Sequence, residues 1–320
     1  MGNSTMVSVL ICTYNQEDTI SQTIDSVLIQ DVNFDFEIII GDDCSTDNTP
    51  QICEAYQKKH PHLIKLAHIS RNVGVVQNWL TCVALSNGKF ITSCAGDDFW
   101  HNTQKLQIQI DYMEQHPECG VLHTDYNILN SVTNELVEFN NKQRNTLIPE
   151  GKQQKNIFNG GLKICAPTAC IRKSLFDKYV PVDKYVELNF PIEDWPTWII
   201  LSAYSDINYL PVSTVTYRHG HESLSNSASY PKIVARFKRE KLMYQFLCEL
   251  FPTDLPFDAK GYDVYVQAVL LNTAFKNNDY LHAKEYGKLL FQSGVKNLKV
   301  FSALNPILFY IYTILKETRK

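Results

Sequence analysis

The sequence predicts an α/β protein with a mostly parallel sheet, followed by a helical C-terminal region. Short apolar runs alternate with segments of helical periodicity up to about residue 130, and the connections between them are short. Polar clusters follow several of the apolar runs, where strands of such a sheet would end. This alternation is typical of a parallel sheet flanked by helices.

Five strands are predicted in the first part of the chain, because each is a short run of apolar and often β-branched residues. They cover residues 7–12, 36–43, 63–69, 89–95 and 120–129. Four helices are predicted between and after them, at residues 19–30, 45–60, 74–88 and 103–117. In the first helix, apolar residues recur at helical spacing, and Asn15 or Asp18 is the candidate N-cap.

The alternation of strand-like and helix-like segments ends after residue 130, which suggests a different organisation of the chain from there on. Residues 131–161 are polar and rich in Asn and Gln, and we expect a hairpin and a mobile loop there. Residues 190–205 predict a helix that opens with two acids, and residues 207–227 a strand that leads into a loop. Beyond residue 230 the pattern is helical without a repeating period. We therefore predict one domain over 1–230, in two halves at 1–130 and 131–230, and a helical region over 231–320.

The composition is that of an ordinary globular protein. The 320 residues are 44% hydrophobic and 20% charged with a formal net charge of −4, which indicates neither disorder nor nucleic-acid binding. Nine cysteines, an odd number without a CxxC pair, suggest buried thiols in a reducing compartment and neither disulfides nor zinc. No charged segment followed by an apolar stretch opens the chain, so we expect no signal peptide and a cytoplasmic protein.

The C-terminal segment 298–320 is strongly apolar, but Lys299, Asn305 and Pro306 interrupt it. It is therefore a poor candidate for a membrane-spanning helix. Basic residues flank it, so two interpretations stay open: a helix docked on the body of the protein, or an interfacial foot on a membrane.

The polar clusters "TYN", "DDCS" and "GDD" follow the first, second and fourth predicted strands. Ligands of parallel sheets bind at this rim, so we expect the functional site there. Asp97 and Asp98 repel each other unless a cation or proton lies between them, and Mg²⁺ or Mn²⁺ binds such carboxylates together with substrate phosphates. The alternative is that one of them caps the helix that begins near Thr103. The second acid pair on the rim, Asp42–Asp43, favours a metal-bound nucleotide diphosphate.

Four stretches occur in the order and spacing of a known family: "SVLICTYNQEDTISQTIDSVLIQ", "EIIIGDDCSTDNT", "RNVGVVQNW" and "ITSCAGDDFW". They resemble the motifs of the family 2 inverting glycosyltransferases, which have the Rossmann-like GT-A fold. The resemblance covers residues 6–130 closely and extends to about 225 through "IEDW" and "YRHGHESLS". It implies a nucleotide-sugar-binding half at 1–130 and an acceptor-binding half at 131–230.

The resemblance implies roles for individual residues. Thr13 and Tyr14 would line the base pocket, with Tyr14 stacked on the base, and Asp43 would hydrogen-bond the base or ribose. Asp98 would contact a divalent metal, Mn²⁺ or Mg²⁺, while Asp97 would contact the metal or the ribose and sugar hydroxyls. The other residues expected to bind the donor are Asn15, Glu17, Asp42, Arg71, Asn72, His219 and His221.

An inverting transfer also needs a base that takes the proton from the acceptor hydroxyl. The "ED" motif implies Asp194 for this role, with Glu193 as second choice, although acids in a first helical turn also act as caps. The spacing of His219 and His221 departs from the family's "YRxHxxSxS" motif, which leaves open which histidine faces the diphosphate. Arg218 could contact a phosphate or form a pair at the edge of the core. A zinc site at H-x-H without cysteine ligands has weak support.

The resemblance implies a bacterial-type enzyme that moves a sugar from a nucleotide diphosphate, with UDP-sugar the expected donor, to a hydroxyl of a glycan or lipid-linked acceptor. Cell-surface polysaccharide synthesis at the cytoplasmic membrane face, with peripheral membrane contact through the C-terminal region, is the expected setting. A nucleotidyltransferase is an alternative, but "TYNQED" replaces the Gly-rich basic loop that it would want. The sequence contains neither the DxDxT motif of a phosphatase nor a P-loop motif. A non-catalytic nucleotide-sugar-binding or assembly protein on the same fold also remains an alternative.

Overall fold

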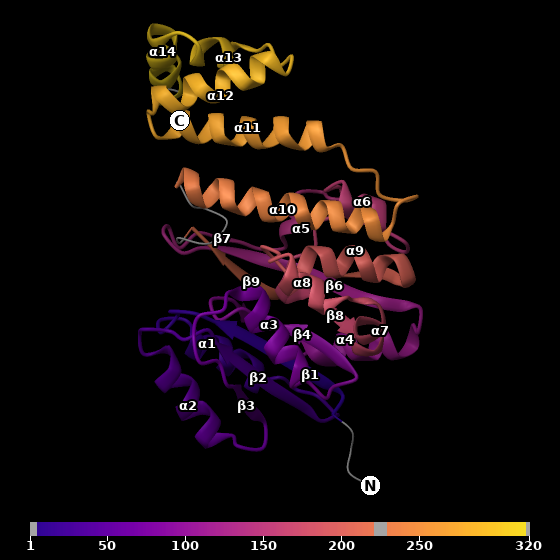
Figure 1. The fold of residues 1–320 in the computed structure, drawn as a ribbon. Coiled ribbons are helices and arrows are strands. Elements are labelled where there is room, and N and C mark those ends of the chain that lie inside the picture. Colours follow the sequence, from indigo (N-terminus) through magenta and orange to yellow (C-terminus); the bar gives the residue numbers. More distant parts are fainter. Residues whose placement is uncertain (1–4, 221–228, 318–320) are drawn as a thin grey trace. The chain divides into compact units, whose positions relative to one another are not determined.

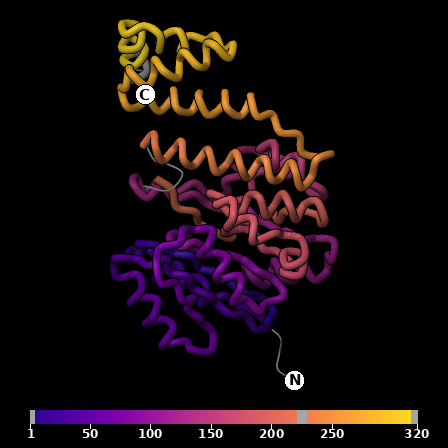
Figure 2. Tube along the Cα trace, viewed as in Figure 1, coloured from indigo at the N-terminus to yellow at the C-terminus, as the bar shows by residue number. Residues whose placement is uncertain are grey.

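The computed structural model describes residues 5–220 and 229–317. The chain divides into two compact units, Met1–His221 and Glu222–Lys320. The first unit is α/β and the second is helical, as Figures 1 and 2 show for each unit by itself. The predicted fold class, an α/β sheet followed by C-terminal helices, is therefore confirmed.

The first unit begins with four parallel strands: β1 (Val7–Thr13), β2 (Phe36–Asp42), β3 (Ile64–Ala67) and β4 (Phe90–Ser93). The helices that connect or follow them are α1 (Ile20–Leu28), α2 (Thr49–Lys59), α3 (Val75–Ala84) and α4 (Lys105–Gln115). Strand β1 is central and buried on both faces, which explains its continuous apolar sequence. Helix α3 packs so closely on β2 that a Cβ at Gly41 would lie 2.0 Å from Asn78 Oδ1, so this position needs glycine.

Five more strands complete a sheet whose order is β3-β2-β1-β4-β8-β6-β9-β5, with β7 paired to β6. They are β5 (Phe99–Trp100), β6 (Cys119–Asn130), β7 (Leu136–Val137), β8 (Cys170–Arg172) and β9 (Asp206–His219). Strand β8 runs antiparallel to both β4 and β6, and β6 and β9 are parallel to each other. The expected hairpin after residue 130 is present as the β6–β7 pair.

Short helices fill the second part of this unit: α5 (Asn140–Gln143), α6 (Gln154–Phe158), α7 (Lys173–Tyr179) and α8 (Val182–Glu187). The longer α9 (Asp194–Tyr204) packs on β6, α6 and α7. It is apolar nearly all round, which agrees with its buried position.

The second unit contains α10 (Tyr230–Leu250), α11 (Ala259–Lys276), α12 (Tyr280–Gln292), α13 (Leu298–Ala303) and α14 (Pro306–Glu317). Helices α10, α11 and α12 lie side by side and the chain reverses direction between them (Figure 2). Helices α11–α14 share a core that includes Leu271, Phe275, Leu290, Val300 and Phe309.

Helix α1 offers a direct test of this packing. Ile24 is fully buried in the core of the first unit, so Ile24→Ala removes apolar contacts and leaves a cavity. We expect a loss of about 2–5 kcal/mol in the free energy of unfolding, measured by urea denaturation. The matched control is Ile29→Ala, at the residue that directly follows the helix, where the side chain is 59% exposed and we expect a change within about 0.5 kcal/mol. Equal losses in the two variants would contradict this placement of α1.

Candidate active site

The turn that carries Asp97 and Asp98 joins β4 to β5, and hydroxyl groups of α1 and the residue before it hold its backbone. Thr23 Oγ1 donates to the carbonyl oxygens of Gly96 (3.0 Å) and Asp98 (2.6 Å), and Thr19 Oγ1 donates to that of Gly96 (2.8 Å). A Cβ at Gly96 would lie 2.6 Å from Thr13 Oγ1, so the turn also needs glycine at this position. The two aspartates are therefore presented by a fixed backbone.

Arg218, near the end of β9, holds the same turn from another strand. Its backbone N–H donates to Asp98 Oδ1 (2.8 Å), and its guanidinium donates to the carbonyl oxygen of Asp97 (2.5 Å) and to the side chain of Gln22. The guanidinium also lies 5.0 Å from the centre of the Phe99 ring. Strand β5 pairs with β9 directly beside these contacts, so Arg218 belongs to the framework of the turn.

The two aspartates differ in environment. Asp98 is 1% exposed, and burial, followed by the charge of Asp97, raises its pKa well above the usual range, although Arg218 acts in the opposite direction. Asp97 is half-buried. Within the described residues no group of three or more His, Cys, Asp and Glu is arranged to hold a metal ion. Two adjacent carboxylates still fit a divalent ion such as Mg²⁺, which takes one or two carboxylates and completes its shell with water and substrate phosphates.

The loops after β1 and β2 are hydrogen-bonded to each other through residues that the sequence predicts to bind the donor. Asn15 Oδ1 accepts the N–H of Thr46 (2.7 Å), and Glu17 Oε2 accepts the N–H of Asn48 (2.9 Å). The side chains of Asn15 and Glu17 are thus engaged within the protein, and their role toward the donor stays a prediction. Tyr14 directly precedes Asn15 and is 46% exposed, so its ring is accessible for stacking.

Asp43 organises the loop that carries Arg71 and Asn72. Its carboxylate accepts the backbone N–H groups of Val73 (2.7 Å) and Gly74 (2.9 Å), and its carbonyl oxygen accepts the side-chain amide of Asn72 (3.1 Å). Asp43 is only 4% exposed. Each carboxylate oxygen can accept more than one bond, so a base or ribose contact stays a prediction beside this structural role.

The remaining rim residues lie close to these loops. Asp42 is half-buried, and its carboxylate accepts the N–H of Ser45 (3.1 Å) and the hydroxyl of the same residue. Thr13 is buried, and its hydroxyl donates to Gln16 Oε1 (2.7 Å). The main chain joins the two strand ends, because the N–H of Asp43 donates to the carbonyl oxygen of Thr13 (3.0 Å).

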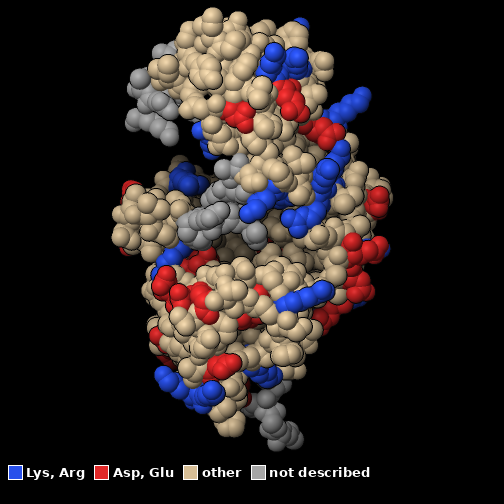
Figure 3. Space-filling view, turned by 60° about the vertical axis from the view of Figure 1, so that its left-hand side comes forward, with Lys and Arg blue, Asp and Glu red and all other residues tan. Residues whose placement is uncertain are grey.

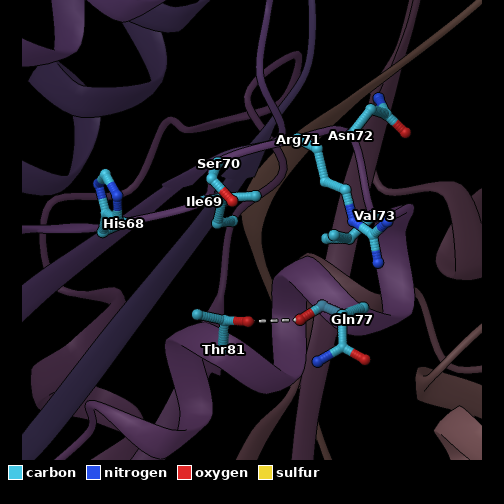
Figure 4. Close-up of a pocket in the computed structure, with 8 residues that line it drawn as sticks. All are labelled: His68, Ile69, Ser70, Arg71, Asn72, Val73, Gln77 and Thr81. Atoms are coloured by element: carbon cyan, nitrogen blue, oxygen red, sulfur yellow. Dashed lines mark hydrogen bonds between the residues drawn. The ribbon is translucent and has the colours of Figure 1, made fainter.

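Arg71 and Asn72 border an open polar hollow of about 510 Å³. Figure 4 shows the Arg71 side chain extending toward Gln77, while Asn72 points away; the other lining residues are His68, Ile69, Ser70, Val73 and Thr81. An exposed guanidinium beside a polar hollow suits a base carbonyl or a phosphate.

Glu193 and Asp194 lie at the start of α9 and line a small cavity of about 30 Å³ together with Thr92 and Ser93, which is room for water. Asp194 Oδ1 accepts the N–H of Trp195 (2.6 Å). Burial, followed by the charge of Asp194, raises the pKa of Glu193 to about 8, and burial also raises the pKa of Asp194.

The charges of Asp98 and Asp194, one from each acid pair, act on two further residues. Burial raises the pKa of the Cys165 thiol, and the charges of Asp98 and Asp194 raise it further. Burial also raises the pKa of Tyr217 to about 12, with contributions from Asp98, Asp97 and Asp194. On β1, the charges of Glu193 and Asp43 both raise the pKa of Cys12, after a hydrogen bond to Cys82 and burial. Members of the rim acids and of the "ED" pair therefore act on the same residues, and their roles toward a donor and an acceptor stay predictions.

Sequence reasoning missed Tyr217, although it stands in the quoted "YRHGHESLS" stretch. The phenol is 40% exposed, and no hydrogen bond joins its hydroxyl to another of the described residues. It is therefore available to donate to a bound substrate. His219 is exposed at the end of β9, and its carbonyl oxygen accepts the N–H of Ser131 (2.8 Å). The predicted site residue His221 lies outside the described residues.

The fold and the acid-lined rim define a protein of the GT-A class. The structure is similar to that of Staphylococcus aureus TarS 1–349 in complex with UDP-GlcNAc, with a TM-score of 0.55 and 19% identity, over 95% of this chain and 86% of that one. At this identity the likeness shows the fold alone. The family model described as "Glycosyl transferase family 2" matches residues 8–180, and the chain belongs to this family.

Curated relatives agree with this membership. The putative teichuronic acid biosynthesis glycosyltransferase TuaG of Bacillus subtilis is 32% identical over 124 residues, which are 39% of this chain and 48% of TuaG. The dTDP-rhamnosyl transferase RfbG of Shigella flexneri is 27% identical over 194 residues, 58% of this chain and 62% of RfbG. The chain thus spans less than two thirds of the length of these relatives.

The raised pKa of Glu193 predicts a pH effect on stability. A carboxyl whose pKa is higher in the folded state stabilises the fold at low pH, and this contribution is lost as the pH rises through about 8. We therefore expect Glu193→Gln, which stays neutral, to have a higher melting temperature than the parent at pH 8 and an equal one near pH 4, measured by thermal unfolding. The control is Glu135→Gln at an exposed position of the β6–β7 turn, where both pH values should give parent-like melting. A pH-independent difference for Glu193→Gln would contradict the burial of this charge.

Proposed function

We propose that this protein is a metal-dependent, inverting glycosyltransferase that moves a sugar from a UDP-sugar to a hydroxyl of a glycan or lipid-linked acceptor. One observation carries the proposal: the charges of Asp97, Asp98 and Asp194 all raise the pKa of the same phenol, that of Tyr217, so these acids lie near one another. A donor-phosphate site and a general base must lie this close if one transfer step is to use both. The family membership supports sugar transfer as the reaction.

The donor half is formed by the loops after β1, β2 and β3. The exposed ring of Tyr14 would stack on the base, and Arg71 would reach its polar edge from the hollow beside α3. Asp43 would act on the donor directly or by holding the backbone of the Arg71 loop through Val73 and Gly74. The UDP-GlcNAc and UDP bound in the TarS structures support UDP as the nucleotide.

Asp98 and Asp97 would hold the divalent ion, and the ion would neutralise the diphosphate as it leaves the sugar. The chain's own contribution here is positional. Thr23 and Arg218 fix the backbone on both sides of the aspartates, so the carboxylates do not have to be ordered when the donor binds. Burial disfavours the charge of Asp98, and a bound cation would favour it again.

Asp194 would serve as the general base. A pKa of about 8 keeps Glu193 neutral near pH 7, so Asp194 is the member of the pair that carries the negative charge. Asp194 would take the proton of the acceptor hydroxyl while the oxygen attacks the anomeric carbon on the face opposite the leaving diphosphate. Attack from that face inverts the anomeric centre. Tyr217 would donate a hydrogen bond to an oxygen of the donor or acceptor in this space.

We place the reaction in cell-surface polysaccharide synthesis at the cytoplasmic face of the membrane, with peripheral membrane contact through the C-terminal region. The name of the relative TuaG, which refers to teichuronic acid biosynthesis, supports this setting. Residues 1–130 would then bind the nucleotide sugar and residues 131–230 the acceptor.

The metal role of Asp98 predicts a specific loss in donor binding. With calorimetry we expect the parent protein to bind UDP more tightly with Mn²⁺ than with a chelator, and Asp98→Ala to show no Mn²⁺-dependent gain. The control is Asp111→Ala on the exposed surface of α4, which removes one carboxylate and should keep the gain. An unchanged Mn²⁺ effect in folded Asp98→Ala would refute the assignment.

The base role of Asp194 predicts a loss of turnover with retained binding. Asp194→Asn preserves the size of the side chain, so UDP affinity should stay close to that of the parent while transfer falls about 10²–10⁴-fold. The measurement is the rate of UDP release with a saturating acceptor, with UDP affinity followed by calorimetry. Parent-like turnover in Asp194→Asn would move the base to another residue, and Glu193→Gln is the next variant to assay.

A further inference from the structure

The helical unit carries an uncovered apolar surface on its last helix. Ile307, Tyr310, Ile311 and Ile314 are 69%, 52%, 47% and 60% exposed. Their spacing of i, i+3, i+4 and i+7 places them on one face of α14, and we call these four residues the α14 stripe. None of the described helices combines the length and the hydropathy that crossing a bilayer requires.

The opposite face of α14 attaches the helix to its unit. Phe309 is fully buried, with its ring 4.7 Å from that of Phe275 and 5.5 Å from that of Tyr280. This part of the C-terminal segment is therefore packed within the helical unit. This packing leaves the side chains of the α14 stripe exposed, so packing within the helical unit does not explain why they are apolar.

A second exposed apolar group lies where α12 leads into α13. The rings of Phe291 and Phe301 meet edge to face at 5.9 Å, with Leu298 between them in sequence and 73% exposed. The ammonium group of Lys296 lies 5.6 Å from the centre of the Phe291 ring. Exposed aromatic rings beside a lysine are typical of residues at a membrane–water interface, where the ring enters the apolar region and the cation faces the headgroups.

The charge of the helical unit indicates what covers the stripe. Residues 222–320 contain 14 Lys and Arg against 9 Asp and Glu, whereas residues 1–221 contain 16 against 25. In Figure 3 the top of the helical unit is a broad uncharged surface with charged side chains at its margin. A second copy of this unit would bring two positive units together, which is unfavourable, whereas an anionic surface attracts it.

We propose that the α14 stripe lies in the interface of an anionic lipid bilayer, with Lys296 and the neighbouring basic residues at the headgroups. The inference rests on the membrane contact of the proposed function and names the surface that makes it. An amphipathic helix of this kind binds through its apolar face and through attraction to anionic lipid, and both contributions are needed for stable binding. It lies along the bilayer and does not cross it.

The test is co-sedimentation of the full-length protein with vesicles of phosphatidylcholine, with or without phosphatidylglycerol. We expect binding to the anionic vesicles, and weaker binding to neutral ones or at high salt. The double variant Ile307→Asp/Ile311→Asp should reduce anionic vesicle binding at least about ten-fold, because each charge would have to enter the interface. Deleting 298–320 is a poorer test, since it also removes the buried Phe309.

The matched control is Val132→Asp/Leu147→Asp, which changes two exposed apolar residues of the first unit, 74% and 90% exposed, and should bind like the parent. Lys296→Glu should weaken binding to anionic vesicles and leave neutral vesicles unaffected. Circular dichroism and thermal unfolding confirm that each variant is folded.

Absence of parent binding to anionic vesicles at low salt would overturn the proposal, as would an equal loss in the control. Gel filtration tests the alternative that a second copy of this chain covers the α14 stripe. If Ile307→Asp/Ile311→Asp converts a dimer to a monomer and leaves vesicle binding unchanged, the stripe is a dimer interface and the membrane proposal is overturned. Asp194→Asn separates this inference from the proposed function, because it should lose transfer and retain vesicle binding.

Discussion

The contact between the backbone N–H of Arg218 and the carboxylate of Asp98 is the interaction on which the site depends. A buried carboxylate is costly unless it is hydrogen-bonded or paired, and Asp98 is almost fully buried. The bond joins two segments 120 residues apart in the sequence, and it lies beside the pairing of Phe99 with Thr216 between β5 and β9. It therefore brings the second part of the α/β unit against the rim formed by the first.

Once this contact is made, several acids gather at the rim, and the charge of Arg218 only partly offsets the burial of Asp98 and the charge of Asp97 beside it. The buried cation Lys105 lies over the Trp100 ring at 4.2 Å, but its ammonium binds the neutral oxygens of Gln109 (2.6 Å) and Thr92 (3.2 Å). Burial lowers the pKa of Lys105 to about 8, and the neighbouring Cys170 and Cys94 offset this only in part. A bound diphosphate would add negative charge beside these carboxylates. A divalent ion between the aspartates and the diphosphate would resolve this repulsion, which is the physical reason for the metal in the proposed function.

Much of the first half of the fold was predictable from the sequence because its elements are long and local. The runs at 7–12 and 36–43 each have an apolar centre, and they form the adjacent parallel strands β1 and β2. Strand β8 was not predicted, since three residues show no periodicity and its place between β4 and β6 depends on pairing with distant segments. Local periodicity predicts single helices and strands, whereas pairing between distant segments leaves no local pattern in the sequence.

The sequence predicted most of the residues that lie at the candidate site, but it predicted only part of what each of them does there. A carboxylate in a rim loop can bind a ligand or a backbone N–H, and the sequence does not distinguish the two. Asp43 and Glu17 both accept backbone N–H groups of neighbouring loops, so part of their chemistry maintains the rim itself. Tyr217 was missed for the opposite reason: a tyrosine in a strand is usually a core residue, and only the converging acids around it mark it as part of the site.

The two acids at the start of α9 are adjacent and share one cavity, yet they are not equivalent. Asp194 opens the helix, where the N–H of Trp195 and the helix dipole both favour a negative charge. Glu193 precedes the helix, and its raised pKa reflects burial and the charge of its neighbour. If one of the two must be ionised near neutral pH, the helix terminus selects Asp194, and Glu193 as the neutral partner limits the repulsion. A like-charged pair of this kind could supply one ionised carboxylate, which the proposed proton abstraction from an acceptor hydroxyl would use.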